Sequence, residues 1–229
     1  MSLMSRMPET VSSSIAFAPC RRAEGSAIDG LFATRGQHRS LDRGVTLVLH
    51  GSPVEQVYQV TSGFLRCCTF TEEGRRQIFA FAGPGDLLGF PDLDSWHFTA
   101  EAVGAAAVSF LRAEIFNAAL RSDIDFASDL RRHCVREFER RERHLGWLSH
   151  MQSEERLLAF LKSLAARSPQ SDGFTDLPMT RQDLGDHLGM TFETVSRSLS
   201  ALKRHGSIRM IGVDRYSIVE QGAYCATAA

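Results

Sequence analysis

Polar residues recur at helical spacing in the segment MTFETVSRSL (190–199) and its continuation. At about 100° per residue they share one face of a helix, opposite Val195, Leu199 and Leu202. The polar face consists of Glu193, Ser196, Arg197, Ser200 and Arg204. In such a set an arginine can donate two parallel hydrogen bonds to guanine O6 and N7, and a glutamate can accept one from cytosine N4. The chemistry of this face is that of reading base edges.

The neighbouring elements decide whether this helix is more than ordinary surface. Thr180 precedes RQDLGDHLG with Asp183 three residues on, which is close to a capping box and predicts a short helix that Gly189 ends. Thr191 opens the polar helix, and SIRMIGVDRYSIV predicts two strands around a GVD turn. Two short helices, a tight turn and a hairpin describe a winged helix-turn-helix. Thr180, Arg181 and Thr191 complete the candidate DNA-binding residues.

The overall composition is that of an ordinary globular protein. The 229 residues are 43% hydrophobic and 23% charged, with a net charge of −1, so any basic surface must be local. No run approaches the ~18 apolar residues that a membrane helix requires. No secretory signal is visible at the N-terminus. We therefore expect a cytoplasmic protein that does not contact membranes, with a flexible leader over residues 1–25.

Residues 26–111 have the pattern of a β-domain. Glycines separate short runs rich in strand-forming residues, which is typical of an antiparallel sandwich or barrel. The runs are VTLVLH, QVYQV, FLRCCTF, RQIFAFA and AAAVSFL. The TEEGRR sequence between two of these runs predicts a hairpin loop with Gly74 at the turn.

Helix-forming residues dominate 112–151, and apolar residues recur there in steps of three and four. Because the apolar stripe is narrow, as in a coiled coil, we expect a helix pair whose long member pairs with a second copy of the chain. The stripe can also pack against the chain's own β-domain. The candidate dimer-interface residues are Leu130, Cys134, Phe138, Arg141, Leu145 and Leu148. Residues 152–229 form the predicted winged helix-turn-helix.

The five cysteines are odd in number and scattered, so neither a disulfide framework nor a metal site is predicted. Cys67 and Cys68 are adjacent and would point to opposite faces of a strand. With Cys134 in the apolar stripe, they are the candidates for control by thiol oxidation.

The segment MTRQDLGDHLGMTFETVSRSLSALKRHG closely resembles the helix-turn-helix of Crp/Fnr-type transcription regulators. Its E-x-x-S-R pattern (Glu193, Ser196, Arg197) is similar to that of the Fnr and FixK branches, and SEERLLAFL and GDLLGF extend the resemblance back to about residue 40. The resemblance implies an α+β fold: an N-terminal cyclic-nucleotide-binding-type β-roll (a jelly roll), a long dimerisation helix and a C-terminal winged helix. It also implies a homodimeric activator that binds a TTGAT-N4-ATCAA-like palindrome and contacts RNA polymerase.

The chain departs from the relatives that bind small molecules. In nucleotide-binding relatives an arginine before Ser or Thr pairs with the cyclic phosphate, whereas here Phe98 precedes Thr99, and His97 would serve only if protonated. A phosphate buried without a cation is costly, so cyclic AMP is not expected. An iron–sulfur cluster needs four thiolates, and only Cys20 lies in the corresponding region. The resemblance thus favours a FixK-type regulator that needs no cofactor.

Two alternatives stay open. In one, the β-domain controls DNA binding by sensing a ligand, haem or thiol oxidation. The histidines that can offer haem an axial ligand are His38, His50, His97, His133 and His144. The more remote alternative is a cupin-like metal enzyme, which would need convergent histidine and carboxylate ligands. No H-x-H pair occurs in the β-region, so we expect neither a metal site nor an enzyme.

Overall fold

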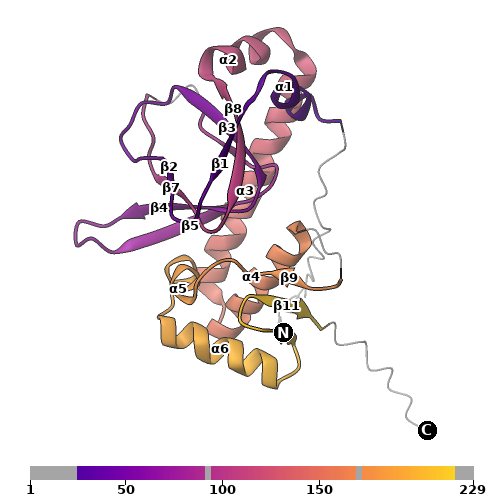
Figure 1. The fold of residues 1–229 in the computed structure, drawn as a ribbon. Coiled ribbons are helices and arrows are strands. Elements are labelled where there is room, and N and C mark those ends of the chain that lie inside the picture. The colour runs from indigo at the N-terminus through magenta and orange to yellow at the C-terminus, as the bar shows by residue number, and fades with distance from the viewer. Residues whose placement is uncertain (1–24, 91–93, 169–171, 220–229) are drawn as a thin grey trace, which may run out of the picture.

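The computed structural model describes residues 25–90, 94–168 and 172–219. Figure 1 shows a β-domain and a smaller, mainly helical domain joined by one long helix, α3 (Ile124–His150). The other helices are α1 (Ala27–Arg35), α2 (Ala113–Ser122), α4 (Ser153–Arg167), α5 (Arg181–Leu188) and α6 (Phe192–Arg204). The strands are β1 (Gln37–Leu41), β2 (Thr46–Val48), β3 (Gln56–Ser62), β4 (Leu65–Phe70), β5 (Arg76–Ala82), β6 (Leu87–Leu88), β7 (Thr99–Ala102), β8 (Ala106–Arg112), β9 (Thr175–Asp176), β10 (Ile208–Ile211) and β11 (Arg215–Ile218). The predicted α+β class is confirmed, and the predicted leader lies, except for Gly25, outside the described residues.

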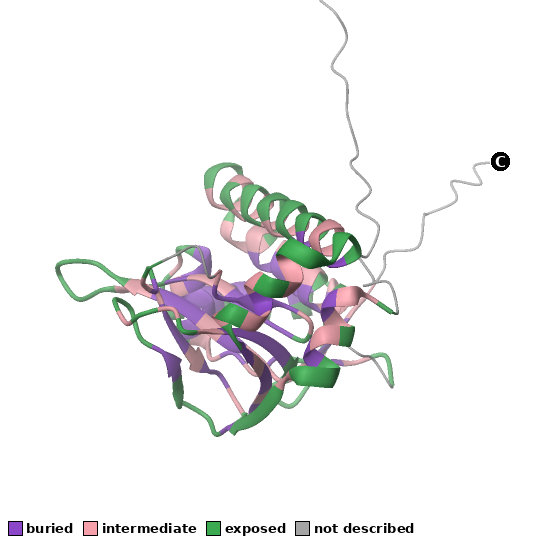
Figure 2. Cartoon of the chain, turned by 90° about the horizontal axis from the view of Figure 1, so that it is seen from above, coloured by how far each residue is buried: buried purple, intermediate pink, exposed green. Residues whose placement is uncertain are grey.

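Two four-stranded antiparallel sheets form the β-domain, with strand orders β1-β8-β3-β6 and β2-β7-β4-β5. Side chains from both sheets, among them Val60, Leu65 and Val108, form the buried core between them. In Figure 2 the buried residues gather on the strands, whereas the connecting loops are exposed. The hairpin predicted at TEEGRR joins β4 to β5, with Gly74 at φ 77°, a left-handed conformation that favours glycine.

The helical region predicted for 112–151 is divided at Asp123. The Asp123 carboxylate accepts hydrogen bonds from the backbone amides of Asp125 and Phe126, which caps α3. Helix α1, which the sequence analysis did not predict, packs with α2 and α3 through a buried cluster that includes Phe32 and Phe116. Among the described residues, no helix is both long and apolar enough to cross a membrane.

Capping residues define α5 as predicted. The Thr180 hydroxyl accepts from the Asp183 amide, and the Asp183 carboxylate accepts from the Thr180 amide, which completes a capping box. Gly189 ends the helix at φ 63°. Gly185 is needed as well, although the sequence analysis did not single it out, because a Cβ there would lie 2.5 Å from the Met190 carbonyl oxygen.

The wing is larger than the predicted hairpin. Strands β10 and β11 pair around the GVD turn as predicted, but β9 pairs with β11 on the other side. The segment between α4 and α5 therefore contributes a strand, which the sequence analysis did not predict. This segment packs against the hairpin: Leu177 is buried, and its amide donates to the Asp214 carbonyl at 2.6 Å.

The β-domain and the winged helix-turn-helix share one apolar core. Ile78 of β5 belongs to the same buried cluster as Leu184 and Leu188 of α5. Cys67 and Cys68 point to opposite sides of β4, as predicted: Cys67 lies in the core of the β-domain and Cys68 in the shared core. Helix α5 is thus packed against the β-domain.

Candidate nucleic-acid interface

The two faces of α6 differ in exposure as the sequence predicted. Glu193, Arg197, Ser200 and Arg204 are exposed, and Ser196 is half-buried. On the other face, Val195, Leu199 and Leu202 are at most 4% exposed and belong to the shared core. Figure 1 places α6 at the end of the molecule remote from the two sheets of the β-domain. The polar face is therefore presented to solvent on a rigidly packed helix.

Hydroxyl groups organise the first turns of α6. Thr191 caps the helix by accepting a hydrogen bond from the Thr194 amide at 3.2 Å, and the two hydroxyl oxygens lie 3.1 Å apart. The Arg197 guanidinium donates to the Thr194 hydroxyl at 3.4 Å. Thr194 was missed by the sequence analysis, although its spacing of three residues from both Thr191 and Arg197 was visible.

Glu193 is an ionised acceptor at the N-terminus of α6. A hydrogen bond from its own backbone amide lowers the pKa of its carboxyl group, and the Thr191 hydroxyl and the charge of Arg197 act in the same direction. The positive end of the helix dipole favours the same charge state. Glu193 is thus held in the form that can accept from the cytosine amino group.

The candidates at the start of α5 are engaged within the domain. The Thr180 hydroxyl takes part in the capping box, and the Arg181 guanidinium donates to the Val213 carbonyl in the wing turn at 3.1 Å. Burial lowers the pKa of Arg181. The hydrogen bond of Arg181 ties the first helix to the wing. DNA contact by Thr180 and Arg181 remains a prediction.

The two wing arginines differ in their contacts. Arg215 binds Asp172 at 2.9 Å and Asp176 at 3.0 Å. Arg209 lies on β10 and is exposed. Arg209 is therefore better placed than Arg215 to contact a DNA phosphate.

Comparison with known proteins identifies the family. A model described as a Crp-like helix-turn-helix domain matches residues 155–221, and one described as a cyclic nucleotide-binding domain matches residues 38–123. The nitrogen fixation regulation protein FixK of Azorhizobium caulinodans is 36% identical over 173 residues, which are 74% of this chain and 70% of that protein. The chain belongs to the Crp/Fnr family of transcription regulators. It is accordingly a DNA-binding regulator of transcription rather than an enzyme.

Further relatives agree with this family. The structure of FixK2 from Bradyrhizobium japonicum has 32% sequence identity and a TM-score of 0.76, covering 81% of this chain and 93% of that chain. The fumarate and nitrate reduction regulatory protein of Escherichia coli is 31% identical over 188 residues, which are 80% of this chain and 74% of that protein. Membership of the family implies dimer formation as well as DNA binding.

The candidate dimer interface on α3 is only partly exposed. Phe138 and Leu145 are 63% and 61% exposed, Cys134 is exposed and Leu148 is half-buried. Leu130 is the exception, because it packs into the cluster formed with α1 and α2 and belongs to the core of its own chain. The sequence analysis did not distinguish it, since helical spacing does not show which end of a long helix its own domain covers.

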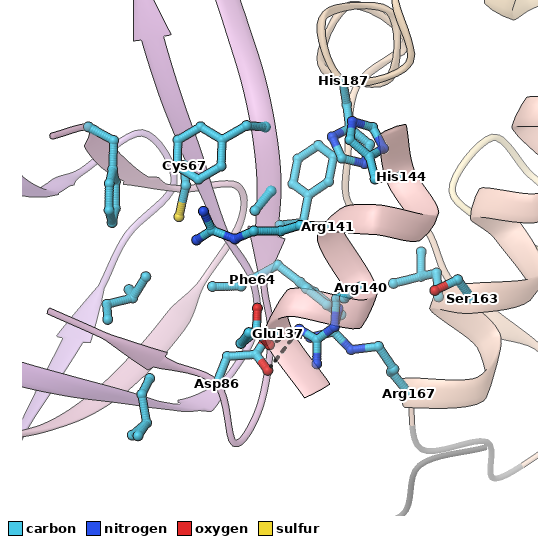
Figure 3. Close-up of a pocket in the computed structure, with 18 of the residues that line it drawn as sticks. Phe64, Cys67, Asp86, Glu137, Arg140, Arg141, His144, Ser163, Arg167 and His187 are labelled. Carbon is cyan, nitrogen blue, oxygen red and sulfur yellow. Dashed lines mark hydrogen bonds and ion pairs between the residues drawn. The ribbon is translucent and has the colours of Figure 1, made fainter. Parts of the chain in front are cut away.

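Arg141 also departs from the predicted apolar stripe. Its guanidinium lies 5.6 Å from the centroid of the Phe79 ring. In Figure 3 it extends from α3 toward Cys67 of the β-domain, over a cavity of about 570 Å³. Arg141 therefore faces the β-domain of its own chain.

The lining of this cavity includes Asp86, Leu87 and Phe98, from the segment that the resemblance compares with the phosphate-binding part of nucleotide-binding relatives. Phe98, at the position of the expected arginine, packs edge-to-face on Phe79 and Trp96, with ring centroids 5.3 and 5.4 Å apart. Aromatic side chains dominate the lining: Phe64, Phe79, Phe81, Phe90, Trp96, Phe98, Trp147 and Phe160. A phosphate placed beside Phe98 would lose its hydration among aromatic rings, and Arg141, over the Phe79 ring, is the cation it could meet there.

Four charged groups at one edge of the cavity are paired with one another. Buried Asp86 accepts hydrogen bonds from Arg167 and from Arg140, the latter at 3.2 Å, and from the Gly83 amide at 2.8 Å. Burial alone would raise the pKa of Asp86, but the two arginines and the amide outweigh it and hold the pKa below its usual value. Arg140 also binds Glu137 at 2.7 Å. Figure 3 shows the four side chains gathered on one side of the cavity.

The candidate sensor groups have mixed settings. Burial raises the pKa of the Cys67 and Cys68 thiols, and both side chains are at most 2% exposed, so neither is a ready thiolate. Cys134 is exposed on α3, and burial of part of its side chain raises its pKa. Cys20 lies outside the described residues.

His144, one of the candidate haem ligands, stacks on His187 with ring centroids 4.1 Å apart. Within the described residues no group of three or more His, Cys, Asp and Glu side chains converges as in a metal site.

Proposed function

We propose that this regulator acts as a homodimeric activator on a TTGAT-N4-ATCAA-like palindrome, without a small-molecule cofactor. The observation that carries this proposal is the exposed face of α6, where Glu193, Ser196 and Arg197 stand on a capped helix whose other face is buried. Arg197 would bind guanine, Glu193 cytosine, and Ser196 a base or phosphate. RNA polymerase is the proposed protein partner, and the cytoplasm the proposed location.

The exposed stripe of α3 supports a dimer around this helix. Phe138 and Leu145 lie seven residues apart, on one face of α3, and large exposed apolar side chains at this spacing are typical of paired helices. We expect Phe138→Glu to weaken dimerisation at least about tenfold, or about 1.4 kcal/mol. Sedimentation equilibrium measures this. Ile124→Glu is the matched control, because Ile124 is also exposed on α3 but lies at its first residue, away from the stripe. Equal dimerisation of both variants would contradict the proposed interface.

Independence from a cofactor rests on the cavity. Its acidic groups are bound to arginines of the same chain, and aromatic rings fill the place of the phosphate-binding arginine. The test is fluorescence anisotropy of a labelled palindrome in air with no added ligand, beside a scrambled duplex. Preferential binding to the palindrome supports the proposal. Absence of preference would contradict it.

A second candidate is control of the same DNA binding by a ligand in the cavity. One observation favours it: the cavity is large enough for a small molecule, and the Arg141 guanidinium beside it pairs with no carboxylate among the described residues. The same anisotropy assay separates the two candidates when it is repeated with haem, cyclic AMP or peroxide. Tighter binding only after one of these additions would favour the second candidate.

A further inference from the structure

Two arginines of the β-domain bind the first helix of the DNA-binding unit. The Arg76 guanidinium donates to Asp183 at 2.8 Å and to Asp186 at 2.8 Å, and Arg66 donates to Asp183 at 3.2 Å. Arg66 is itself held by Glu101 at 2.8 Å. The arginines belong to β4 and β5, and the aspartates to α5. These ion pairs therefore cross from one domain to the other.

Asp183 joins the cap of α5 to this contact. One of its oxygens, Oδ2, accepts from the Thr180 amide at 3.1 Å and hydroxyl at 2.7 Å. The other, Oδ1, accepts from Arg66 and Arg76. Asp183 is 1% exposed, and a carboxylate at such depth is tolerated only with this number of partners. The orientation of α5 is thus tied to the positions of the two arginine side chains.

A neutral histidine extends the contact along α5. Burial and the neighbouring His144 lower the pKa of His187 to about 3, and its Nδ1 donates to the Ile78 carbonyl at 3.0 Å. The carbonyl belongs to β5, the same strand that carries Arg76. One face of α5 is therefore fixed to β5 by ion pairs, a hydrogen bond and the shared apolar core.

Along the chain, a short linker joins α3 to the DNA-binding unit. Residues Met151 and Gln152 separate α3 from α4. Arg156 of α4 donates to the carbonyls of Leu148 and Met151, at 3.3 and 3.0 Å, and to that of Leu188 at 2.6 Å. The linker alone leaves rotation about a few backbone bonds, so a fixed orientation needs further contacts. The ion pairs with β4 and β5 supply one, and the pair of Arg167 on α4 with Asp86 of the β-domain supplies another.

We propose that Arg66 and Arg76 are positioning residues for DNA binding: through Asp183 and Asp186 they fix the helix-turn-helix relative to α3, so that the two α6 helices of a dimer are held at the half-site separation without a ligand. This inference rests on the proposed function. Half-sites of a palindrome lie about 34 Å apart, and both are bound together only when the two reading helices keep that spacing. The contact uses the side of α5 that faces β5, and the polar face of α6 stays exposed.

The test compares a palindrome with a duplex that carries a single half-site. Arg76→Glu places a like charge beside Asp183 and Asp186, so we expect affinity for the palindrome to fall about tenfold or more, because the second half-site is no longer presented in register. Affinity for the single half-site stays within about twofold, because α6 keeps its own contacts. A structural defect within the DNA-binding unit would instead lower both affinities equally, and that result would overturn the proposal.

Two further variants complete the design. Arg76→Glu combined with Asp186→Arg restores opposite charges and is expected to recover part of the affinity for the palindrome. Arg75→Glu is the matched control, because Arg75 is the residue before Arg76. Its side chain is 80% exposed, and its ion pair is with Glu73 of the hairpin. Wild-type affinity of Arg76→Glu for the palindrome, or absence of recovery in the double variant, would overturn the proposal.

Hydrogen exchange separates this inference from the proposed function. Amides of α5 and of residues 150–153 are expected to exchange faster in Arg76→Glu than in wild type and Arg75→Glu, whether or not DNA is present. If wild-type protein does not prefer the palindrome, the proposed function fails. If it does, and exchange is unchanged in Arg76→Glu, the proposed function stands and the positioning role fails.

Discussion

The polar face of α6 and the cavity beside α3 both combine arginines with carboxylates, but the groups are paired differently. On α6, Glu193 and Arg197 are exposed on successive turns. At the cavity, Asp86 is buried and accepts from Arg140 and Arg167 of its own chain. In the first region the charged groups face solvent, and in the second the carboxylate is bound by arginines within the fold.

This difference distinguishes the two activities that the matched domains would allow. A base edge can be read only by donors and acceptors that meet no stronger partner within the protein. A cyclic phosphate would need a cation, and the cavity offers Phe98 where an arginine is expected. We therefore expect the paired charges of the cavity to support the fold and the exposed charges of α6 to contact DNA. Four variants or additions test this division, in order of expected effect.

Asp86→Asn should have the largest effect on stability and should leave the polar face of α6 unaltered. Removing the carboxylate leaves Arg140 and Arg167 without a counter-charge, which should lower the free energy of unfolding by about 3 kcal/mol. The same pairing predicts acid sensitivity. Because the pKa of Asp86 is lowered in the folded state, its contribution is present above about pH 4 and is lost as the pH falls through the folded pKa.

Urea denaturation at several pH values measures both effects, with Asp125→Asn as the control. Asp125 is exposed in the first turn of α3. The loss of stability in acid should be smaller in Asp86→Asn than in wild type. A stability equal to that of wild type at neutral pH would show that the cavity charges do not support the fold.

Arg197→Ala should weaken DNA binding and leave stability almost unchanged, which is the opposite of Asp86→Asn. Loss of the bidentate contact should weaken binding to the palindrome by about 1–3 kcal/mol and relax discrimination at one base pair. Stability should change little, because the Arg197 side chain is exposed and its contact is the hydrogen bond to Thr194 at 3.4 Å. Anisotropy titrations against each substitution of the guanine test this. Unchanged affinity would mean that α6 does not read the groove through Arg197.

The sequence predicted the exposed polar face of α6 more completely than the lining of the cavity, for a physical reason. The α6 face is encoded by neighbours along one helix, so its period and its cap Thr191 were visible locally. The cap Thr180 and the final Gly189 of α5 were visible in the same way. The ion pairs of Asp86 join residues 54 and 81 positions away, and the pairs of Asp183 span more than 100. No local period encodes such separations.

The long helix α3 also shows that spacing along the sequence does not reveal contacts with distant parts of the chain. Its apolar spacing was visible, but Leu130 is covered by α1, an element that the sequence analysis did not predict. Arg141 shares the spacing and yet turns toward Phe79. Period alone identifies residues that share a face, and the chain's other domains decide which part of that face stays open.

Arg141→Leu sharpens the comparison, because Arg141 and Arg197 are both exposed arginines on helices. Arg141 makes a cation–π contact with Phe79, so its loss should cost about 0.5–1 kcal/mol of stability. Binding to the palindrome should match wild type. Thermal unfolding and anisotropy on the same samples provide the two values. Weaker DNA binding at wild-type stability would place Arg141 in a sensing or dimer role instead.

Cyclic AMP should have the smallest effect of the four. The cavity has the volume for a small molecule, so size alone does not exclude the nucleotide. Its phosphate, however, would lie among Phe79, Trp96 and Phe98. Arg140 and Arg167 are bound to Asp86, and the Arg141 guanidinium is in contact with the Phe79 ring. We therefore expect no shift in thermal unfolding of the wild-type protein when cyclic AMP is added. Asp86→Asn releases Arg140 and Arg167 from their carboxylate, so a shift confined to that variant would show that internal pairing, rather than shape, keeps the nucleotide out. A shift in the wild type would show that the cavity binds the nucleotide despite its paired charges.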